Sequence, residues 1–264
     1  MITINELQLA FHFILWRLFF YIYLKIPIYY EMKKLIIAST STIHGSDYLE
    51  YLLPTLKTFF STIDELLFIP YARPSGMSYD NYTERVSTVF SIIGIKVKGI
   101  HEFNDAQEAV LNAQAIFVGG GNTFVLVNEL YKQDLMQILK EKVKTGTPYL
   151  GTSAGSNICG MTMQNTNDMP IVYPPSHETL GVIPFNINAH YLDPDPNSTH
   201  KGETRETRIK EFHTYNDIPV LGLREGSWLE VVGEEIILIG KLKARLFEQH
   251  KQPKELDSGS IIQF

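Results

Sequence analysis

The sequence GTSAG at residues 151–155 is the first pattern in the chain that could carry a catalytic group. It follows a predicted strand and precedes a predicted helix, the context in which a nucleophilic serine projects from a sharp strand-to-helix turn. The glycines leave room for that turn, so the hydroxyl of Ser153 would point out of the sheet. Small residues are also common at ordinary strand–helix turns. The motif therefore makes Ser153 a candidate nucleophile that still needs a base.

A second glycine-rich turn, GGGNT at residues 119–123, ends a neighbouring predicted strand. Phosphate binding is the usual alternative for such a turn before a helix. However, the Gly-Lys-Ser/Thr ending of a phosphate-binding loop is missing, and Phe124 stands where a dinucleotide-binding pattern needs its third glycine. We expect instead that the backbone N–H groups of Gly121 and Ala154 converge on a developing oxyanion.

A serine nucleophile needs a base, and His190 is the best placed of the eight histidines because it follows an apolar stretch. An acid would fix the tautomer of that imidazole and stabilise its charged form. Asp168 and Glu225 both fit this role, although each also fits an ordinary turn or cap. The chain order serine, aspartate, histidine occurs in other α/β hydrolytic folds. That analogy slightly favours Asp168 over Glu225 as the partner of His190.

Two arginines, Arg205 and Arg208, are three residues apart on one face of a predicted charged helix. Such a pair could clamp a substrate carboxylate with paired hydrogen bonds. The alternative is an ordinary solvated face whose charges pair with one another. The sequence leaves both interpretations open.

Alternating strands and helices must hold these residues. Strands are predicted at 35–39, 66–69, 95–97, 115–118 and 148–151, and helices at 47–61 with Asp47 as cap, 79–93, 106–112 and 135–144. This alternation indicates a mostly parallel sheet with helices on both faces and ligands at the carboxyl ends of the strands. Turn residues dominate 166–200. A helix at 203–212 and strands at 220–223, 228–232 and 236–239 follow, the last two as a hairpin.

Residues 1–31 differ from the rest in carrying nine aromatic side chains and a long apolar run. A secretory signal is disfavoured because residues 1–6 hold no positive charge and no small-residue cleavage site follows. Arg17 would lie near the centre of a bilayer, at a cost of about 2.5–3.5 kcal/mol. We therefore expect a dispensable extension, with a membrane-associating helix or a docked helix as alternatives. Residues 32–264 then form a single α/β domain.

Composition limits the remaining functions. A net charge of −6 argues against a nucleic-acid-binding protein that works through a large basic surface. The single cysteine, Cys159, allows no intramolecular disulfide and too few ligands for a cysteine-based zinc site, and it fits a reducing compartment such as the cytoplasm. No metal or other cofactor is implied. We expect a monomer or homodimer that is not held in a membrane.

Four blocks, at 119–124, 151–157, 166–172 and 200–208, together resemble the peptidase E family, the S51 serine peptidases. The resemblance runs from about residue 32 to residue 228. It implies a three-layer α/β sandwich similar to class I glutamine amidotransferases. It places the family's nucleophile on Ser153, its histidine on His190, an aspartate implicated in activity on Asp168 and a proposed third triad member on Glu225. Two departures are Thr152, where the family's tryptophan is expected, and the extension at 1–31.

The expected function is that of a serine dipeptidase that removes an N-terminal aspartate from Asp-X dipeptides. Asn122, Arg205 and Arg208 are the candidate donors for the aspartyl side chain, and the partner is a small peptide. One alternative is a cyanophycinase-like peptidase acting on a β-linked aspartyl-arginine polymer. Another is a catalytically silent, amidotransferase-like domain that binds a small ligand.

Overall fold

The computed structural model describes residues 32–197, 199 and 202–263. Residues 32–264 form one compact unit. The predictions made for residues 1–31 lie outside the described residues. Within the described ranges, no helix is both long enough and apolar enough to cross a membrane.

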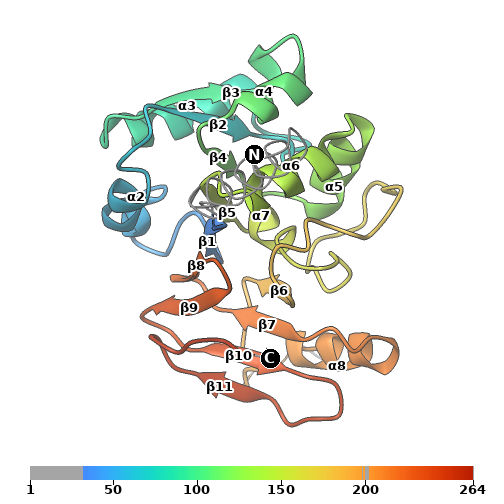
Figure 1. Cartoon of the computed structure of the whole chain (residues 1–264). Helices are drawn as coiled ribbons and strands as arrows, with labels where there is room; N and C mark the ends of the chain where they lie inside the picture. Colours follow the sequence, from blue (N-terminus) through green and yellow to red (C-terminus); the bar gives the residue numbers. More distant parts are fainter. Residues whose placement is uncertain (1–31, 198, 200–201, 264) are drawn as a thin grey trace, which may run out of the picture. The chain divides into compact units, whose positions relative to one another are not determined.

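A seven-stranded sheet is the centre of this unit (Figure 1), with the strand order β3-β2-β4-β5-β1-β8-β9. The first five strands in that order are parallel, and β8 and β9 form an antiparallel hairpin added beside β1. Both the parallel sheet and the hairpin confirm the sequence predictions. The strands are β1 (Lys34–Ala38), β2 (Glu65–Ile69), β3 (Lys96–Gly99), β4 (Ile116–Val118), β5 (Tyr149–Thr152), β8 (Ser227–Val232) and β9 (Glu235–Gly240).

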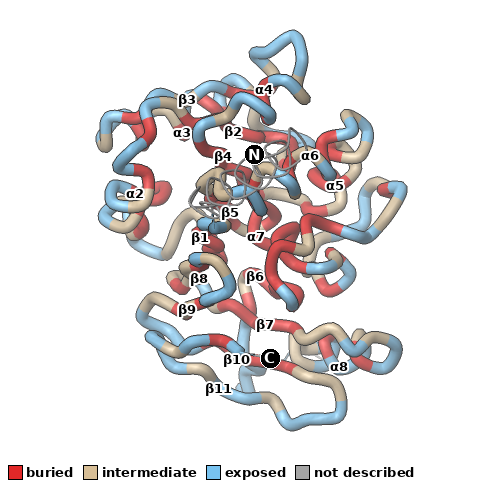
Figure 2. The backbone as a smooth tube through the Cα atoms, viewed as in Figure 1, coloured by how far each residue is buried: buried red, intermediate tan, exposed pale blue. Residues whose placement is uncertain are grey.

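Helices cover both faces of this sheet and give the three layers of an α/β sandwich. Side chains alternate along each strand, so Leu35 and Ile37 of β1 join one core while Ile36 and Ala38 join the other. The first core packs α4 (Ala106–Asn112), α5 (Thr123–Lys132) and α6 (Leu135–Lys144) against the sheet, and the second packs α2 (Leu53–Phe59) and α3 (Tyr79–Ser91). The buried backbone is concentrated in these strands and in the helix faces toward them (Figure 2).

The first predicted helix is shorter in the structure than in the sequence prediction. A 3-10 turn, η1 (Glu50–Leu52), leads into α2, and Pro54 lies in the first turn of that helix. The expected cap at Asp47 is wrong, because its backbone N–H donates to the side chain of Glu50 instead of its carboxylate capping a helix. A second 3-10 turn, η2 (Ile100–Glu102), follows β3. Two helices, α4 and α6, have the predicted bounds.

A second, four-stranded sheet was not predicted. Its order is β11-β10-β7-β6, and α8 (Arg205–Tyr215) packs on it through Tyr191, Ile209, Val220 and Phe247 (Figure 1). Strands β6 and β7 are parallel, and the other pairs are antiparallel. The strands are β6 (Asn186–Ala189), β7 (Val220–Leu223), β10 (Ala244–Phe247) and β11 (Lys254–Leu256).

Strand β6 has a sequence that looks like a loop because two of its four residues are asparagines. Both asparagines are buried, and their side chains bind the neighbouring segment. The amide of Asn186 contacts the backbone and hydroxyl of Thr162, and the amide of Asn188 donates to the carbonyl of Asn165. These hydrogen bonds replace the apolar burial on which periodicity depends. Helix α5 was also missed, although Asn122 caps it by accepting from the N–H of Val125.

Candidate active site

Ser153 lies on a sharp turn between β5 and the short helix α7 (Ala154–Asn157). Its backbone has φ 53° and ψ −110°, a conformation that a non-glycine residue adopts only when its surroundings impose it. The turn also requires glycine on either side. A Cβ at Gly155 would lie 2.1 Å from the carbonyl oxygen of Val118, and one at Gly151 would lie 2.5 Å from the carbonyl oxygen of Gly155. The sequence GTSAG therefore forms the strained turn that its pattern predicted.

The hydroxyl of Ser153 is hydrogen-bonded to His190, whose other ring nitrogen contacts Glu225. The Ser153 Oγ to His190 Nε2 distance is 2.9 Å, and the His190 Nδ1 to Glu225 Oε1 distance is 2.7 Å. An ionised carboxylate can only accept, so Nδ1 carries the proton and Nε2 is free to accept the serine proton. The side chains of His190 and Glu225 are 38% and 49% exposed. The three groups form the chain of contacts that activates a serine.

Asp168 does not contact His190 in this arrangement. Its Oδ2 accepts hydrogen bonds from the backbone N–H and the hydroxyl of Thr123, at 2.8 and 2.5 Å, and from the hydroxyl of Thr166 at 3.0 Å. The preference for Asp168 as the partner of His190 is therefore wrong. Both nitrogens of the imidazole are already taken, by Ser153 and Glu225. Order along the chain does not decide which acid reaches the ring.

The four-stranded sheet positions His190 and Glu225 at the carboxyl edge of the seven-stranded sheet. His190 directly follows β6, and Glu225 lies two residues after β7, which runs parallel to β6. Ser39, the buried residue after β1, joins both strand ends to the main sheet. Its hydroxyl accepts from the backbone N–H of His190 at 2.9 Å and donates to the carbonyl of Leu223 at 2.7 Å. No local sequence signal marks this bridge.

An ion-pair cluster fixes the same two strand ends from the other side. The guanidinium of Arg224 binds both carboxylate oxygens of Asp193, at 2.8 and 2.7 Å, and both oxygens of Glu255, at 2.9 and 3.0 Å. Asp193 lies three residues after His190, and Arg224 directly precedes Glu225. Hydrogen bonds from Arg224 hold the pKa of Asp193 and the pKa of Glu255 below their ordinary values. The cluster therefore resists separation of the two segments that carry His190 and Glu225.

The backbone of the glycine-rich turn lies against Ser153. A Cβ on Gly120 would lie 3.0 Å from the Cβ of Ser153, and Gly121 has φ +147° with the carbonyl of Ala72 close beside it. Among the described residues, neither the N–H of Gly121 nor that of Ala154 donates a hydrogen bond within the protein. Two free backbone donors near a serine hydroxyl are what an oxyanion site requires.

The three candidate substrate-binding side chains differ in their existing contacts. Asn122 caps α5 with its oxygen and donates from its amide nitrogen to the carbonyl of Met169 at 2.9 Å. Arg208 is 3.7 Å from Glu203. Arg205 makes no hydrogen bond or ion pair with any residue that the structure describes. Burial and the nearby Arg208 lower the pKa of Arg205, while Asp168 acts in the opposite direction.

Cys159 lies close to the site in the sequence but is not part of it. The thiol is fully buried and contacts the carbonyl of Gly155 at 3.5 Å. Burial raises the pKa of Cys159, so the reactive thiolate is disfavoured. Thr152, the departure noted before the serine, is also buried as the last residue of β5. The candidate nucleophile at this edge of the sheet is therefore the hydroxyl of Ser153 and not this thiol.

A family model for peptidase family S51 matches residues 35–239 of the chain. Peptidase E of Streptomyces coelicolor is 51% identical over 228 residues, which is 86% of this chain and 93% of the relative. The chain belongs to peptidase family S51. A relative in Drosophila melanogaster described as "Probable alpha-aspartyl dipeptidase" is 45% identical over 85% of this chain and 93% of its own length. The family resemblance expected from the four sequence blocks is confirmed.

The fold is also that of solved structures in this group. The crystal structure of a peptidase from an acI-B1 Actinobacterium superposes with a TM-score of 0.67 at 18% identity, over 89% of this chain and 98% of that one. At such low identity the similarity concerns the fold alone. The three-layer α/β architecture with its mostly parallel sheet confirms the predicted sandwich.

Proposed function

We propose that this S51 protein is a serine-type dipeptidase that hydrolyses dipeptides with an N-terminal aspartate. The observation that carries the proposal is the continuous hydrogen-bonded chain from Ser153 through His190 to Glu225. The relatives named peptidase E and alpha-aspartyl dipeptidase, which match most of the chain, support the choice of substrate.

In the first half of the reaction, Ser153 Oγ attacks the carbonyl carbon of the aspartyl residue while His190 Nε2 takes the hydroxyl proton. The N–H groups of Gly121 and Ala154 donate to the resulting oxyanion. His190 then gives its proton to the leaving amine, the C–N bond breaks and residue X departs. Water attacks the acyl-serine in the second half, with His190 again as base, and aspartate is released. Glu225 keeps the imidazole oriented and balances its charge in both halves.

Recognition of aspartate is assigned to the charged groups around the 166–172 segment. A substrate with an N-terminal aspartate brings a side-chain carboxylate and an α-ammonium group. Arg205, half-buried and without a protein partner among the described residues, is suited to the carboxylate. Asp168, which is close enough to influence Arg205, is suited to the ammonium group through its Oδ1. Arg208 and the second hydrogen of the Asn122 side-chain amide, whose first donates to Met169, are the further candidate donors.

Three substrates test the proposal against its alternatives: Asp-Leu, Leu-Leu and cyanophycin. A dipeptidase selective for aspartate cleaves the first alone, a cyanophycinase-like enzyme cleaves the polymer, and a silent binding domain cleaves none. The variant Ser153→Ala removes one hydroxyl from a turn and should leave the thermal unfolding midpoint within a few degrees of the wild type. Its Asp-Leu hydrolysis should fall by orders of magnitude. A residual rate above about a tenth of the wild type would refute the serine mechanism, given the losses seen for triad deletions.

The proposal assigns catalysis to residues 32–264, as a single peptidase domain, and treats residues 1–31 as dispensable. A chain that begins at Met32 should therefore be soluble and hydrolyse Asp-Leu at the full-length rate. Recovery of activity only with the full chain, in membranes or detergent, would instead favour a membrane-associating segment. We also propose a cytoplasmic location, which the buried free thiol of Cys159 supports. Cell fractionation tests it directly.

A further inference from the structure

We propose that the cavity beside Glu225 is the subsite for residue X, and that it selects dipeptides with a bulky apolar side chain and a free carboxylate at that position. This inference rests on the proposed dipeptidase function and adds the substrate class on the leaving-group side.

The cavity has a volume of about 810 Å³ and mainly apolar walls. It lies between the segment after β1, the start of β8 and the turn that leaves β9. Apolar or aromatic side chains form most of its surface, namely Ile43, Tyr51, Trp228, Ile239 and Leu242. Glu225 and Gly226 complete the wall on the side of the catalytic groups. A single large side chain fits within such a volume.

The chemistry of the cleavage places residue X on this side of the serine. His190 must hand its proton to the amine of X, so that amine lies next to His190 Nε2. The other nitrogen of the same ring is 2.7 Å from Glu225, which lines the cavity. One extended residue spans about 3.3–3.6 Å, so a side chain that starts at the leaving amine can pass along the ring toward Glu225. The cavity therefore adjoins the hydrogen-bonded chain of Ser153, His190 and Glu225 at its Glu225 end.

Its walls are held in place before any ligand arrives. The hydroxyl of Tyr51 donates to the carbonyl of Thr40 at 2.6 Å. The rings of Tyr51 and Trp228 meet edge to face at 6.1 Å, and the indole N–H of Trp228 is bonded to Glu230. Both aromatic side chains thus present apolar faces with their polar atoms already satisfied. Apolar side chains gain most from such a preformed pocket.

Two basic side chains on the cavity wall are unpaired among the described residues. Lys241 and His44 make no hydrogen bond or ion pair there, whereas Lys243, two residues further on, is bonded to Asp257 at 2.7 Å. A dipeptide differs from longer peptides in that residue X carries a negatively charged carboxylate. We assign the binding of that carboxylate to Lys241, with His44 beside it.

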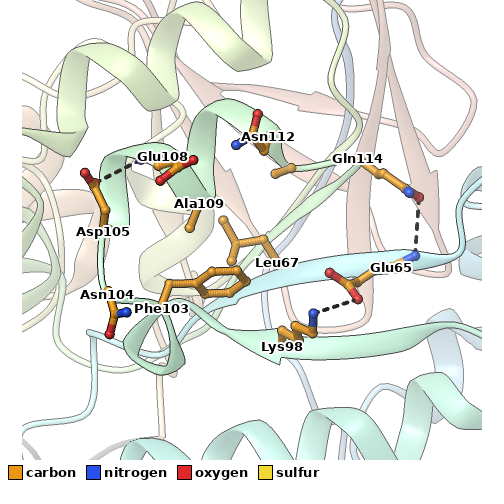
Figure 3. A pocket seen from close by; sticks show the side chains of 11 residues that line it. Glu65, Leu67, Lys98, Phe103, Asn104, Asp105, Glu108, Ala109, Asn112 and Gln114 are labelled. Carbon is orange, nitrogen blue, oxygen red and sulfur yellow. Dashed lines mark hydrogen bonds and ion pairs between the residues drawn. The ribbon is translucent and has the colours of Figure 1, made fainter.

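A second cavity, near the opposite end of the sheet strands, shows the contrasting case (Figure 3). It has a volume of about 410 Å³ and lies between α4 and the starts of β2 and β4. Its one basic side chain, Lys98, is paired to Glu65 at 3.3 Å, and Gln114 accepts from the backbone of Glu65. That cavity has no unpaired basic side chain among the described residues and is remote from Ser153, so it is not the subsite.

The test compares kcat/KM for Asp-Leu, Asp-Ala and Asp-Leu amide in wild type, Leu242→Glu, Lys241→Gln and the control Lys243→Gln. Leu242 is 47% exposed and the lysines lie on the surface, so all three variants should fold. Wild type should favour Asp-Leu over Asp-Ala by about tenfold or more, the usual range for added methylene groups in an apolar pocket. Leu242→Glu should reduce that ratio to below about threefold, since its carboxylate faces the apolar side chain.

Lys241→Gln should lower kcat/KM for Asp-Leu by roughly three- to fivefold, the range of an exposed ion pair. Asp-Leu amide lacks the carboxylate, so the same variant should change kcat/KM for this substrate by less than about 1.5-fold. Lys243→Gln should match the wild type on all substrates.

The outcomes separate the subsite from the activity. Equal kcat/KM values for Asp-Leu and Asp-Ala in the wild type, or no change of their ratio in Leu242→Glu, would overturn the apolar subsite while leaving the dipeptidase intact. An equal loss on the acid and the amide in Lys241→Gln would overturn the carboxylate contact. If the wild type cleaves neither Asp-Leu nor Asp-Ala, the proposed function itself fails.

Discussion

Replacing Glu225 by glutamine tests the proposed division of labour between the two acids. The substitution keeps the shape of the side chain and removes its charge. The 2.7 Å contact with His190 Nδ1 can persist, but the amide can now present an N–H as well as an oxygen. When the N–H faces Nδ1, the proton of the imidazole moves to Nε2, which is then unable to accept the proton of Ser153. We therefore expect kcat to fall both because the charge of Glu225 is lost and because Nε2 no longer accepts the serine proton.

The size of the loss can be worked from the geometry. Two unit charges 2.7 Å apart interact by about 1.5 kcal/mol in water, and the loss of that energy alone is about a tenfold reduction in rate. The water value applies because the side chains of His190 and Glu225 are both more than a third exposed. Replacing the acid of a buried triad by its amide lowers kcat by about 10⁴-fold, because the imidazole then adopts the wrong tautomer. An exposed acid lies between these limits, so we expect a fall in kcat of roughly a hundredfold.

The assay is steady-state hydrolysis of Asp-Leu, with thermal unfolding of each variant as a check on folding. The matched control is Glu235→Gln, which should retain the wild-type kcat. Glu235 is an exposed carboxylate at the start of β9 and has no ion-pair partner among the described residues. KM should change little in Glu225→Gln, because the acid acts through His190 and not on the substrate. If Glu225→Gln keeps more than half of the wild-type kcat, the inference from the His190 contact is refuted.

Three further predictions concern the groups around this pair. Asp168→Asn should raise KM for Asp-Leu by about tenfold and change kcat by less than threefold, because this acid is proposed to hold the α-ammonium group; a hundredfold loss of kcat would contradict that role. Ser39→Ala should lower the free energy of unfolding by about 1–3 kcal/mol and also lower kcat at constant KM, since two backbone groups lose their bridge; denaturant melts and kinetics measure both. Arg224 lowers the pKa of Asp193 and of Glu255, so these ion pairs stabilise the folded protein. The stabilisation is fully present at pH values above the ordinary pKa of each acid, and it is lost as the pH falls through the lowered pKa values. Urea melts between about pH 5 and pH 3 should show that loss, and Glu255→Gln should flatten it.

Local sequence patterns determined much of the first sheet. Four of its five parallel strands are short apolar runs that can be recognised in the sequence because both of their faces are buried, whereas the edge strand β3 carries two exposed lysines. The turn around Ser153 could be predicted from the sequence for a different reason. Only glycine fits where a Cβ would meet a carbonyl oxygen at 2.1 Å, so the constraint leaves a mark in the sequence itself. The candidate nucleophile Ser153 and the glycine-rich turn beside it could therefore be found without coordinates.

The second sheet could not be predicted from such patterns, although one of its strands, at 220–223, was expected and is β7. Strand β6 carries buried asparagines in place of apolar residues, and the hydrogen bonds that compensate them come from a segment more than twenty residues away. Periodicity records how each residue faces water or a core, and it does not record which distant group satisfies a buried amide.

The choice between Asp168 and Glu225 was decided by tertiary structure alone. Both are single acids in turn-like segments, and nothing local distinguishes an acid that accepts from Thr123 from one that accepts from His190. Glu225 reaches the imidazole because β6 and β7 run parallel, so that the residues after them emerge side by side, and because Ser39 ties both strand ends to the main sheet. The sequence determined which residue types were available at the edge of the sheet, and long-range strand pairing determined which of them meet.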